Sequence, residues 1–431
     1  MMLSRSWALG LVVGGVLGLS SVALALNAPQ PLHRAKPQPH LSNSRRTGTR
    51  RAVSRNSRAR ATSVNAKSMT TRSKVVATGS KARLRKTVLS RHRYYERFTA
   101  SSFASSDIFT GDKIAGEDPI VRQAAIDALD GMNGTAVVID PSNGRILAMV
   151  NQKLALSPGA EPCSTIKLTV AMAALSEGLV TRDTPVQLAG FRMNMTQALA
   201  KSNNLYFEEL GRELGFERVR HYATQFGLGE LAGYNIPGEQ LGIYPDQAIP
   251  QSQGGVGRMC SFGQGVSLTP LQLGAYVAAM ANGGTLYYLQ HPTSPDEVAH
   301  MTPKVKRTLD IARYVPEMQD GMSGAVEYGT ARRLRASFTQ LPVFGKTGTC
   351  SDNGTRFGWF ASYSESPQGN LVTVFFLEGG RPTFGPRAAE LTGAFYKNLW
   401  DRDYFVQKDT VASTTTPVAA STATTGTAAS Q

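Results

Sequence analysis

Runs of β-branched and apolar residues bounded by turn residues mark the strands of this chain. Residues 135–140 and 145–150 form two such runs, and the tetrapeptide between them, Pro-Ser-Asn-Gly, is typical of a turn. This pattern predicts a β-hairpin. Three more runs of the same kind lie far along the chain, at residues 343–350, 357–363 and 371–377. The chain is therefore predicted to form five strands, two early and three late.

The segments between and after these strands have the apolar spacing of helices. Helical patterns cover residues 164–179, 196–214, 216–226 and 270–282, and a closing one covers residues 388–400. Two strands, a helical insert, three strands and a closing helix predict one mixed sheet that carries a helical subdomain. A functional site is expected at the seam between the sheet and the subdomain.

The positive charge of the chain is concentrated in one segment. The 431 residues carry a formal net charge of +15, but residues 27–105 hold 19 Lys/Arg and one acid, Glu96, while residues 106–431 have a net charge of −4. Because residues 27–105 contain few large apolar side chains, they are predicted to be a disordered linker. The linker serves either as a spacer or as a polybasic strip on anionic lipid or wall polymer.

The first 26 residues have the pattern of an export signal. Arg5 precedes an uncharged apolar run, residues 7–26, which is about long enough to span a bilayer. Residues 23–25, Ala-Leu-Ala, form a candidate cleavage site, so a membrane anchor and a cleaved signal both stay open. Export also removes the usual reason to expect a nucleic-acid partner. The predicted organisation is residues 1–26 as signal or anchor, 27–105 as linker, 106–405 as the folded domain and 406–431 as a disordered Thr/Ala/Ser-rich tail.

The first of three polar motifs, Ser164-Thr-Ile-Lys167, opens a predicted helix. At a spacing of three, Lys167 lies on the same helix face as Ser164. A serine hydroxyl is a weak nucleophile until a base takes its proton, and a desolvated lysine near another cation can do so. The helix behind the motif is apolar nearly all round, so these two side chains are expected to face a cleft. Alone, the motif is also compatible with a capped core helix.

Two further motifs add amide, hydroxyl and amine groups. Residues 202–204, Ser-Asn-Asn, interrupt a helical apolar pattern and can relay a proton and hold a peptide bond. Residues 346–349, Lys-Thr-Gly-Thr, lie in a predicted strand that could pair with an extended peptide, where Lys346 can receive a carboxylate. Taken singly, the two motifs are equally well explained as a helix cap and a glycine bulge.

Together the motifs say more than each does alone. They stand in one order, 38 residues from Ser164 to Ser202 and 144 from Ser202 to Lys346. In this arrangement the chain resembles the penicillin-binding transpeptidases and serine β-lactamases, whose motifs are S-x-x-K, S-x-N and K-T-G. Further stretches look like the class B transpeptidase domain, namely residues 136–150, 261–265, 268–270, 281–284 and 358–360. The resemblance implies an α+β fold in which helices flank a five-stranded antiparallel sheet with an inserted helical subdomain.

The resemblance also implies a catalytic set. Ser164 would attack the penultimate D-alanine of a peptidoglycan stem peptide, Lys167 would act as general base, and Ser202 would relay a proton to the leaving amine. Backbone N–H groups of Ser164 and Thr349 would form the oxyanion hole. Penicillin and other β-lactams would acylate the same serine. Neither a cofactor nor a metal is implied, and the protein would work in the cell envelope, on the outer side of the cytoplasmic membrane.

The substrate-binding set comes from the second and third motifs. By resemblance, Asn204 would hold the substrate amide, and Lys346, Thr347 and Thr349 would bind the terminal carboxylate. Gly348 would leave room for the peptide to approach the strand.

Alternative activities differ in what happens to the acyl group. A class A β-lactamase needs a glutamate that activates water, and Glu208, Glu209 and Glu213 stay open for this role. A class D enzyme has an apolar residue where Asn204 stands and a mid-chain tryptophan, but Trp occurs here only at positions 7, 359 and 400. A D,D-carboxypeptidase remains open because the motifs do not specify the acceptor. A non-catalytic sensor is the remaining alternative, although all three motifs are complete.

The cysteines suggest one contact across the cleft. Cys163 and Cys350 each adjoin a residue of the implied oxyanion pair. Two donors to one oxygen lie within a few ångströms of each other, so we hypothesise that these cysteines are close enough to form a disulfide. Side chains alternate along a strand, so Cys350 could instead point into the core. The third cysteine, Cys260, would then be free.

Overall fold

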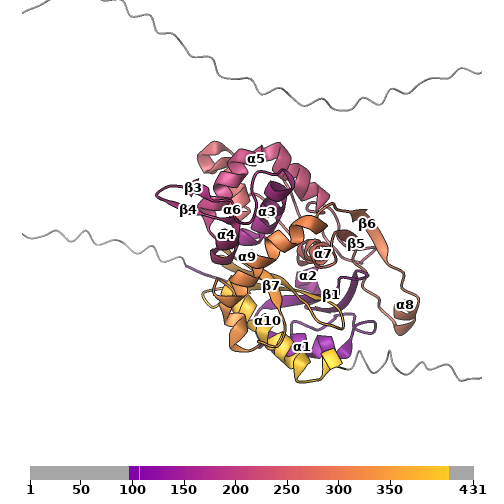
Figure 1. The fold of residues 1–431 in the computed structure, drawn as a ribbon. Helices are drawn as coiled ribbons and strands as arrows, with labels where there is room; N and C mark the ends of the chain where they lie inside the picture. The colour runs from indigo at the N-terminus through magenta and orange to yellow at the C-terminus, as the bar shows by residue number, and fades with distance from the viewer. Residues whose placement is uncertain (1–96, 106, 407–431) are drawn as a thin grey trace, which may run out of the picture. The chain divides into compact units, whose positions relative to one another are not determined.

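A five-stranded sheet organises the fold in a computed structural model that describes residues 97–105 and 107–406 of the protein (Figure 1). The strand order is β2-β1-β9-β8-β7, and every neighbouring pair is antiparallel. The strands are β1 Gly134–Asp140, β2 Arg145–Val150, β7 Val343–Asp352, β8 Thr355–Ser364 and β9 Leu371–Gly379. The five predicted strands and the antiparallel sheet are confirmed. The expectation of a mixed sheet is wrong, because β9 pairs between the early hairpin and β8 with strand directions that alternate throughout.

The helices fall where the apolar spacing predicts them, with several additions. The long helical elements of the described residues are α1 Pro119–Leu129, α3 Lys167–Ser176, α5 Asn204–Gln225, α7 Pro270–Ala281, α9 Val315–Glu327 and α10 Gly385–Trp400. The shorter ones are α2 Gln152–Ala155, η1 Cys163–Ile166, α4 Met195–Lys201, η2 Gln251–Gln253, α6 Gly255–Phe262, α8 Pro295–Ala299, η3 Ala312–Tyr314 and η4 Arg332–Ala336. Two small hairpins that the pattern did not predict complete the fold, β3 Val186–Leu188 with β4 Phe191–Met193, and β5 Thr285–Tyr288 with β6 Lys304–Thr308.

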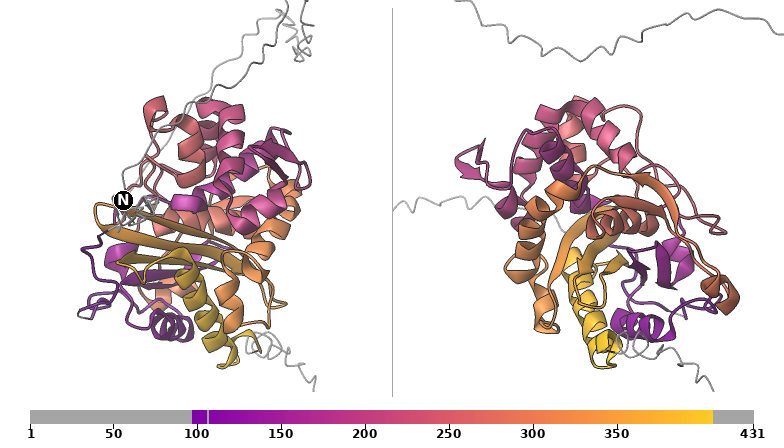
Figure 2. Two further views of the ribbon diagram at one scale, coloured as in Figure 1. Left: turned by 90° about the vertical axis from the view of Figure 1, so that its left-hand side faces the viewer. Right: turned by 45° about the vertical axis from the view of Figure 1, so that its right-hand side comes forward.

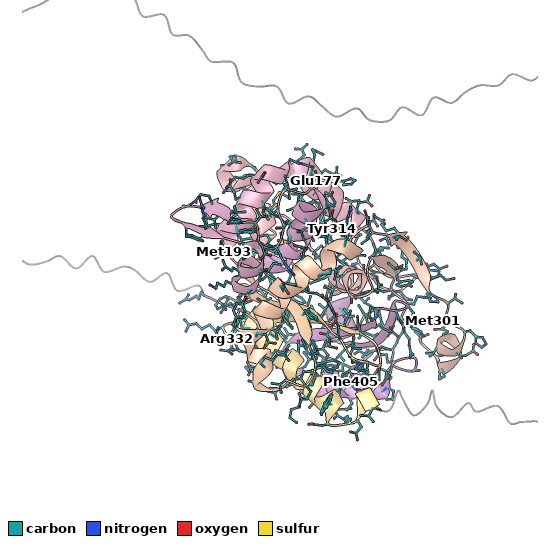
Figure 3. The ribbon with its side chains drawn as sticks, viewed as in Figure 1. Glu177, Met193, Met301, Tyr314, Arg332 and Phe405 are labelled. Atoms are coloured by element: carbon teal, nitrogen blue, oxygen red, sulfur yellow. A yellow bond between two sulfur atoms is a disulfide. The ribbon has the colours of Figure 1, made fainter. Side chains whose placement is uncertain are left out.

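The central sheet is buried on both faces. Val137 and Ile139 of β1 face a large core shared with α3, α5 and α7, whereas Ala136 and Val138 face a second core shared with α1 and α10. This division follows from the pleat, which points successive side chains to opposite sides. Figure 2 shows the two groups of helices on opposite sides of the sheet, and the side chains of Figure 3 fill the space between the layers. The domain is thus a helix–sheet–helix sandwich.

Helices α3 to α6 form the subdomain that the sequence predicts on one side of the sheet. Residues 167–175 of α3 are all buried, which explains why this helix is apolar on every side. The predicted boundary between two helices near residue 215 appears as a sharp bend inside α5, where Gly215 has a φ of 74°. A positive φ is accessible to glycine at little cost, so the bend falls at this residue.

Several residues before 106, the predicted start of the folded domain, are hydrogen-bonded to the domain. The Thr99 N–H donates to Gly354 O over 3.0 Å, and Ser102 Oγ lies 2.8 Å from Thr383 Oγ1. Ser102 Oγ also accepts from the Gly380 N–H. These contacts attach residues 99–102 to the domain, on the N-terminal side of the predicted boundary. Short polar residues carry no apolar periodicity, so their pattern alone did not indicate that they are held by the domain.

Other predicted segments lie outside the residues that the structure describes. These are the signal or anchor at residues 1–26, the linker up to residue 96 and the tail from residue 407. Within residues 97–105 and 107–406, we find no helix that is both long enough and apolar enough to cross a membrane.

Candidate active site

The sequence predicted that Ser164 lies in the first turn of an α-helix. In the structure it lies in a tight turn before the helix. The turn is the 3-10 element η1, and α3 begins only at Lys167. Pro162 O accepts from both the backbone N–H and the hydroxyl of Thr165, at 3.1 and 2.7 Å. Cys163 and Thr165 are buried, while Ser164 is partly exposed. The turn therefore presents the hydroxyl of Ser164 to solvent and keeps its neighbours inside.

Lys167 joins the first two motifs. Its Nζ lies 2.9 Å from Ser164 Oγ, 2.6 Å from Asn204 Oδ1 and 3.1 Å from Ser202 Oγ. A fourth oxygen, Ser202 O, accepts from Nζ over 3.0 Å. The side chain has no solvent exposure, and the ring of Phe207 lies 5.7 Å from Nζ. The spacing of three residues thus brings the amine to the serine hydroxyl, and the second motif surrounds it with oxygens.

A break between two helices places the second motif. Ser202 directly follows α4 and has a left-handed conformation with a φ of 53°, and Asn204 begins α5. Between them, Asn203 caps α5 by accepting from the Tyr206 N–H over 3.0 Å. Of the three residues of the motif, Asn203 thus has a structural role as a helix cap. The other two, Ser202 and Asn204, turn toward Lys167.

Lys346 brings the third motif to the same point. It lies on β7, which is an edge strand of the sheet, and its Nζ is 2.8 Å from Ser202 Oγ and 2.9 Å from Thr347 O. The side chain is fully buried. Ser202 Oγ consequently lies between two lysine amines, those of Lys167 and Lys346, although 144 residues separate it from the second.

The surroundings of Lys167 and Lys346 disfavour a positive charge on both amines at once. Burial, together with the nearby positive charge of Lys346, holds the pKa of Lys167 well below that of an ordinary lysine, and Glu208 opposes this effect. Burial lowers the pKa of Lys346 to about 7. Desolvation and a like charge both disfavour the protonated amine, so the pair favours a state in which at least one lysine is neutral. A neutral lysine beside a serine hydroxyl can act as its base.

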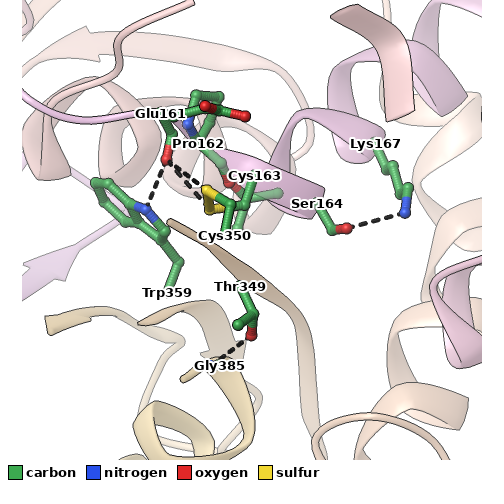
Figure 4. Close-up of a disulfide and its surroundings, with 10 residues drawn as sticks. Glu161, Pro162, Cys163, Ser164, Lys167, Thr349, Cys350, Trp359 and Gly385 are labelled. Atoms are coloured by element: carbon green, nitrogen blue, oxygen red, sulfur yellow. Dashed lines mark hydrogen bonds between the residues drawn. A yellow bond between two sulfur atoms is a disulfide. The ribbon is translucent and has the colours of Figure 1, made fainter. Parts of the chain in front are cut away.

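The two threonines of the third motif point away from Lys346. Thr347 Oγ1 lies 2.6 Å from Thr330 Oγ1, and Thr349 Oγ1 accepts from the Gly385 N–H at the start of α10 over 2.8 Å. Alternation along β7 places both on the face opposite to the Lys346 side chain. The close-up in Figure 4 shows Thr349 directed at Gly385. The sequence predicted one carboxylate site made by all three side chains, and it missed Thr330, which no motif marks.

Gly348 lies against the η1 turn. A Cβ at this position would lie 2.8 Å from Pro162 O and 3.2 Å from Thr165 Cγ2. The missing side chain therefore lets the η1 turn approach β7 closely. The approach of a peptide at this position stays a prediction.

Gly348→Ala is expected to push the η1 turn away from β7. We expect a fall of about 10²-fold in the rate at which Ser164 is acylated, because a shift of about 1 Å in a reacting group can cost this much. Acylation by a fluorescent penicillin and the melting temperature measure the two effects separately. An unchanged acylation rate would show that the turn tolerates the added methyl group.

The hypothesis that Cys163 and Cys350 meet is confirmed. They form a disulfide across 187 residues of chain, with their Cα atoms 5.5 Å apart, and Cys260 is free and buried (Figure 4). The turn of Cys163 and strand β7 are therefore linked covalently beside Ser164.

The glutamates that stayed open for a β-lactamase lie on α5. Arg212 forms ion pairs with Glu208 and Glu209, each at 2.8 Å, and Glu213 is exposed. A carboxylate held by a guanidinium is not free to bind and orient a water molecule. This pairing does not favour a water-activating role for Glu208 or Glu209.

Comparison with known proteins places the domain among cell-wall enzymes. A family model described as penicillin binding protein transpeptidase domain matches residues 134–397. Stage V sporulation protein D of Bacillus subtilis is 31% identical over 264 residues, which are 51% of this chain and 40% of that protein. The peptidoglycan D,D-transpeptidase FtsI of Escherichia coli is 27% identical over 292 residues, or 60% of this chain and 46% of that protein. The match spans less than half of each of these two relatives.

Solved structures support the same fold. Pseudomonas aeruginosa PBP2, in complex with WCK 5153, superposes with a TM-score of 0.56 at 23% identity, covering 67% of this chain and 77% of that one. A peptidoglycan glycosyltransferase from Burkholderia ambifaria has a TM-score of 0.57 at 20% identity, covering 68% of this chain and 98% of that one. These likenesses concern the fold, and they confirm the fold class that the motifs imply.

Proposed function

The chain belongs to the penicillin-binding protein transpeptidase family, and on this premise we propose that it is a serine D,D-transpeptidase that cross-links peptidoglycan stem peptides and is acylated by penicillin. One observation carries the proposal. Lys167 Nζ lies within 3.1 Å of side-chain oxygens of Ser164, Ser202 and Asn204, and Lys346 Nζ lies 2.8 Å from Ser202 Oγ. Three motifs that are distant in sequence thus meet around one buried amine.

In the proposed reaction, Ser164 Oγ attacks the carbonyl carbon of the penultimate D-alanine, and neutral Lys167 takes the hydroxyl proton. The tetrahedral intermediate collapses, the peptide bond breaks, and the terminal D-alanine leaves after its amine receives a proton through Ser202. An amine of a second stem peptide then attacks the ester and restores the Ser164 hydroxyl. Ser202 suits the relay because its hydroxyl contacts both lysine amines.

The charges of the two lysines support the proposed role of Lys167 as the base. A substrate carboxylate near Lys346 would favour its protonated form, although burial alone lowers the pKa of Lys346 to about 7. A charged Lys346 in turn disfavours a proton on Lys167. Binding of the carboxylate would therefore leave Lys167 as the neutral base at the moment of attack.

The free edge of the sheet is the proposed binding site for the extended peptide substrate. An edge strand such as β7 has unpaired backbone groups that can bond an extended peptide. We propose that Asn204 Oδ1 and the amine of Lys346 supply polar contacts. The hydroxyls of Thr347 and Thr349, with Thr330 beside Thr347, would supply others from the opposite face of β7. The backbone N–H groups of Ser164 and Thr349 are the proposed oxyanion donors.

The proposal extends to where the protein works. Residues 1–26 have the pattern of a signal or anchor, so we place the catalytic domain on the outer side of the cytoplasmic membrane, where stem peptides are joined. The linker that precedes the folded domain would act as a spacer or contact anionic lipid or wall polymer.

The lifetime of the acyl-enzyme tests the proposed function. The full-length protein is incubated with a fluorescent penicillin, the free drug is removed, and the adduct is followed for hours. We expect a stable adduct, and with a stem-peptide donor and an amino acceptor we expect a cross-linked product. Hydrolysis of the donor despite added acceptor would instead identify a D,D-carboxypeptidase. Rapid turnover of the drug would identify a β-lactamase, and folded protein without any adduct would leave the non-catalytic sensor.

A further inference from the structure

The disulfide lies between the two backbone segments that carry the proposed oxyanion donors. Cys163 directly precedes Ser164 in the η1 turn, and Cys350 directly follows Thr349 on β7. The Cα atoms of the two cysteines are 5.5 Å apart. Each donor is therefore close along the backbone to the same covalent link.

The nucleophile turn has an unfavourable backbone that its surroundings must hold. Cys163 has a φ of 52°, a left-handed conformation that non-glycine residues seldom adopt. Such conformations persist where the surrounding structure constrains them. Here the Trp359 indole N–H donates to Glu161 O over 3.0 Å, and the turn approaches β7 at Gly348. The disulfide is the covalent member of this set (Figure 4).

We infer that the Cys163–Cys350 disulfide positions the oxyanion hole, and that acylation of Ser164 depends on the oxidised state of this pair. The inference rests on the proposed function and adds a redox dependence to it. Cys163 and Cys350 are positioning residues, because they act through the backbone N–H groups of Ser164 and Thr349.

Reduction would change the geometry through a defined exchange. A dithiol attacks one sulfur of the disulfide as a thiolate, a mixed disulfide forms, and the second thiol of the reductant displaces it. The products are two cysteine thiols and the oxidised reductant. Sulfurs that were bonded at about 2 Å then keep to roughly 3.5 Å or more as non-bonded atoms. Cys163 is fully buried and Cys350 is partly buried, so we expect the turn and β7 to separate to accommodate the two thiols.

The size of the effect follows from the loss of alignment. Removal of one oxyanion donor costs on the order of 10²–10³ in rate. A displacement of about 1 Å in a reacting group can cost about 10²-fold. We therefore expect reduction to lower the acylation rate constant of Ser164 by about 10- to 100-fold, while the non-covalent affinity for penicillin changes little.

The test compares oxidised and reduced full-length protein with the same fluorescent penicillin. Dithiothreitol is the reductant, and saturation kinetics separate the acylation rate constant from the binding constant. Alkylation after denaturation counts the thiols, with one expected before reduction and three after. The Cys260→Ala variant removes the third thiol and should respond to reduction like the wild type. The double variant Cys163→Ala/Cys350→Ala should be acylated slowly without reductant, and dithiothreitol should not change its acylation rate constant.

Each outcome bears on the inference. A slow reduced enzyme that recovers on reoxidation supports it, whereas equal acylation rate constants in the two states would make the disulfide merely structural. Three thiols before reduction would also overturn it, since the disulfide would then not exist in the protein. Where reduced protein unfolds, the double variant decides the matter, and normal acylation by that variant overturns the inference. If the oxidised wild type is not labelled at all, both the proposed function and this inference are wrong.

Discussion

Ser164→Ala is expected to abolish covalent labelling by penicillin and to lower peptide transfer by at least about 10⁴-fold, since removal of a nucleophile leaves only the weak catalysis of the remaining site. The substitution removes one hydroxyl from a partly exposed position, so the fold should persist. The Lys167 amine would lose one of its four oxygen neighbours and keep those of Ser202 and Asn204. Gel fluorescence after incubation with a fluorescent penicillin measures the labelling.

A matched serine variant separates loss of the nucleophile from loss of the fold. Ser366 lies in the turn between β8 and β9, where its hydroxyl donates to Gly369 O, so Ser366→Ala should be labelled like the wild type. Persistent labelling of Ser164→Ala, located by peptide mapping, would instead point to Ser202, whose hydroxyl also contacts Lys167. That result would contradict the role we propose for Ser164.

Lys167→Met is expected to slow acylation of Ser164 by about 10²–10⁴-fold, which is the usual contribution of a positioned general base. Methionine keeps an apolar side chain of similar length in a fully buried place, so the packing of α3 should survive. The matched control is Lys201→Met, because Lys201 ends α4 next to Ser202 and is exposed. Stopped-flow or rapid-quench labelling with penicillin gives the rate constants.

The pH dependence of acylation provides a second readout of the same role. Because burial and the charge of Lys346 lower the pKa of Lys167, the neutral amine forms at a pH well below that of an ordinary lysine. The wild-type rate should therefore rise with pH through a midpoint well below 10.5. This rise should be absent in Lys167→Met. In Lys346→Met the like charge is gone, so the midpoint should move to higher pH.

An unchanged midpoint in Lys346→Met would show that desolvation alone sets the pKa of Lys167. A rate that does not vary with pH in the wild type would be more serious, because it would remove Lys167 as the base. Both results would leave the family assignment intact, since that rests on the match over residues 134–397.

The sequence by itself determined the family, the five strands and the residues around the buried amine. Periodicity located the strands, because alternation and β-branched runs are local properties of the chain. The spacing of three between Ser164 and Lys167 likewise fixed their neighbourhood, since it depends only on helical geometry. The order of the three motifs supplied the long-range information that a single motif lacks.

The tertiary structure decided contacts between segments that are far apart in sequence. Ser202 lies between two lysines, and Gly348 makes room for the η1 turn. Thr349 points to the start of α10, where its hydroxyl accepts from Gly385. The left-handed backbone of Cys163 also has no local signal, because cysteine carries no preference for it. Adjacency to two proposed donors suggested the disulfide, but only the fold brought Cys163 and Cys350 across 187 residues to within bonding distance, since that approach depends on how η1 packs against β7.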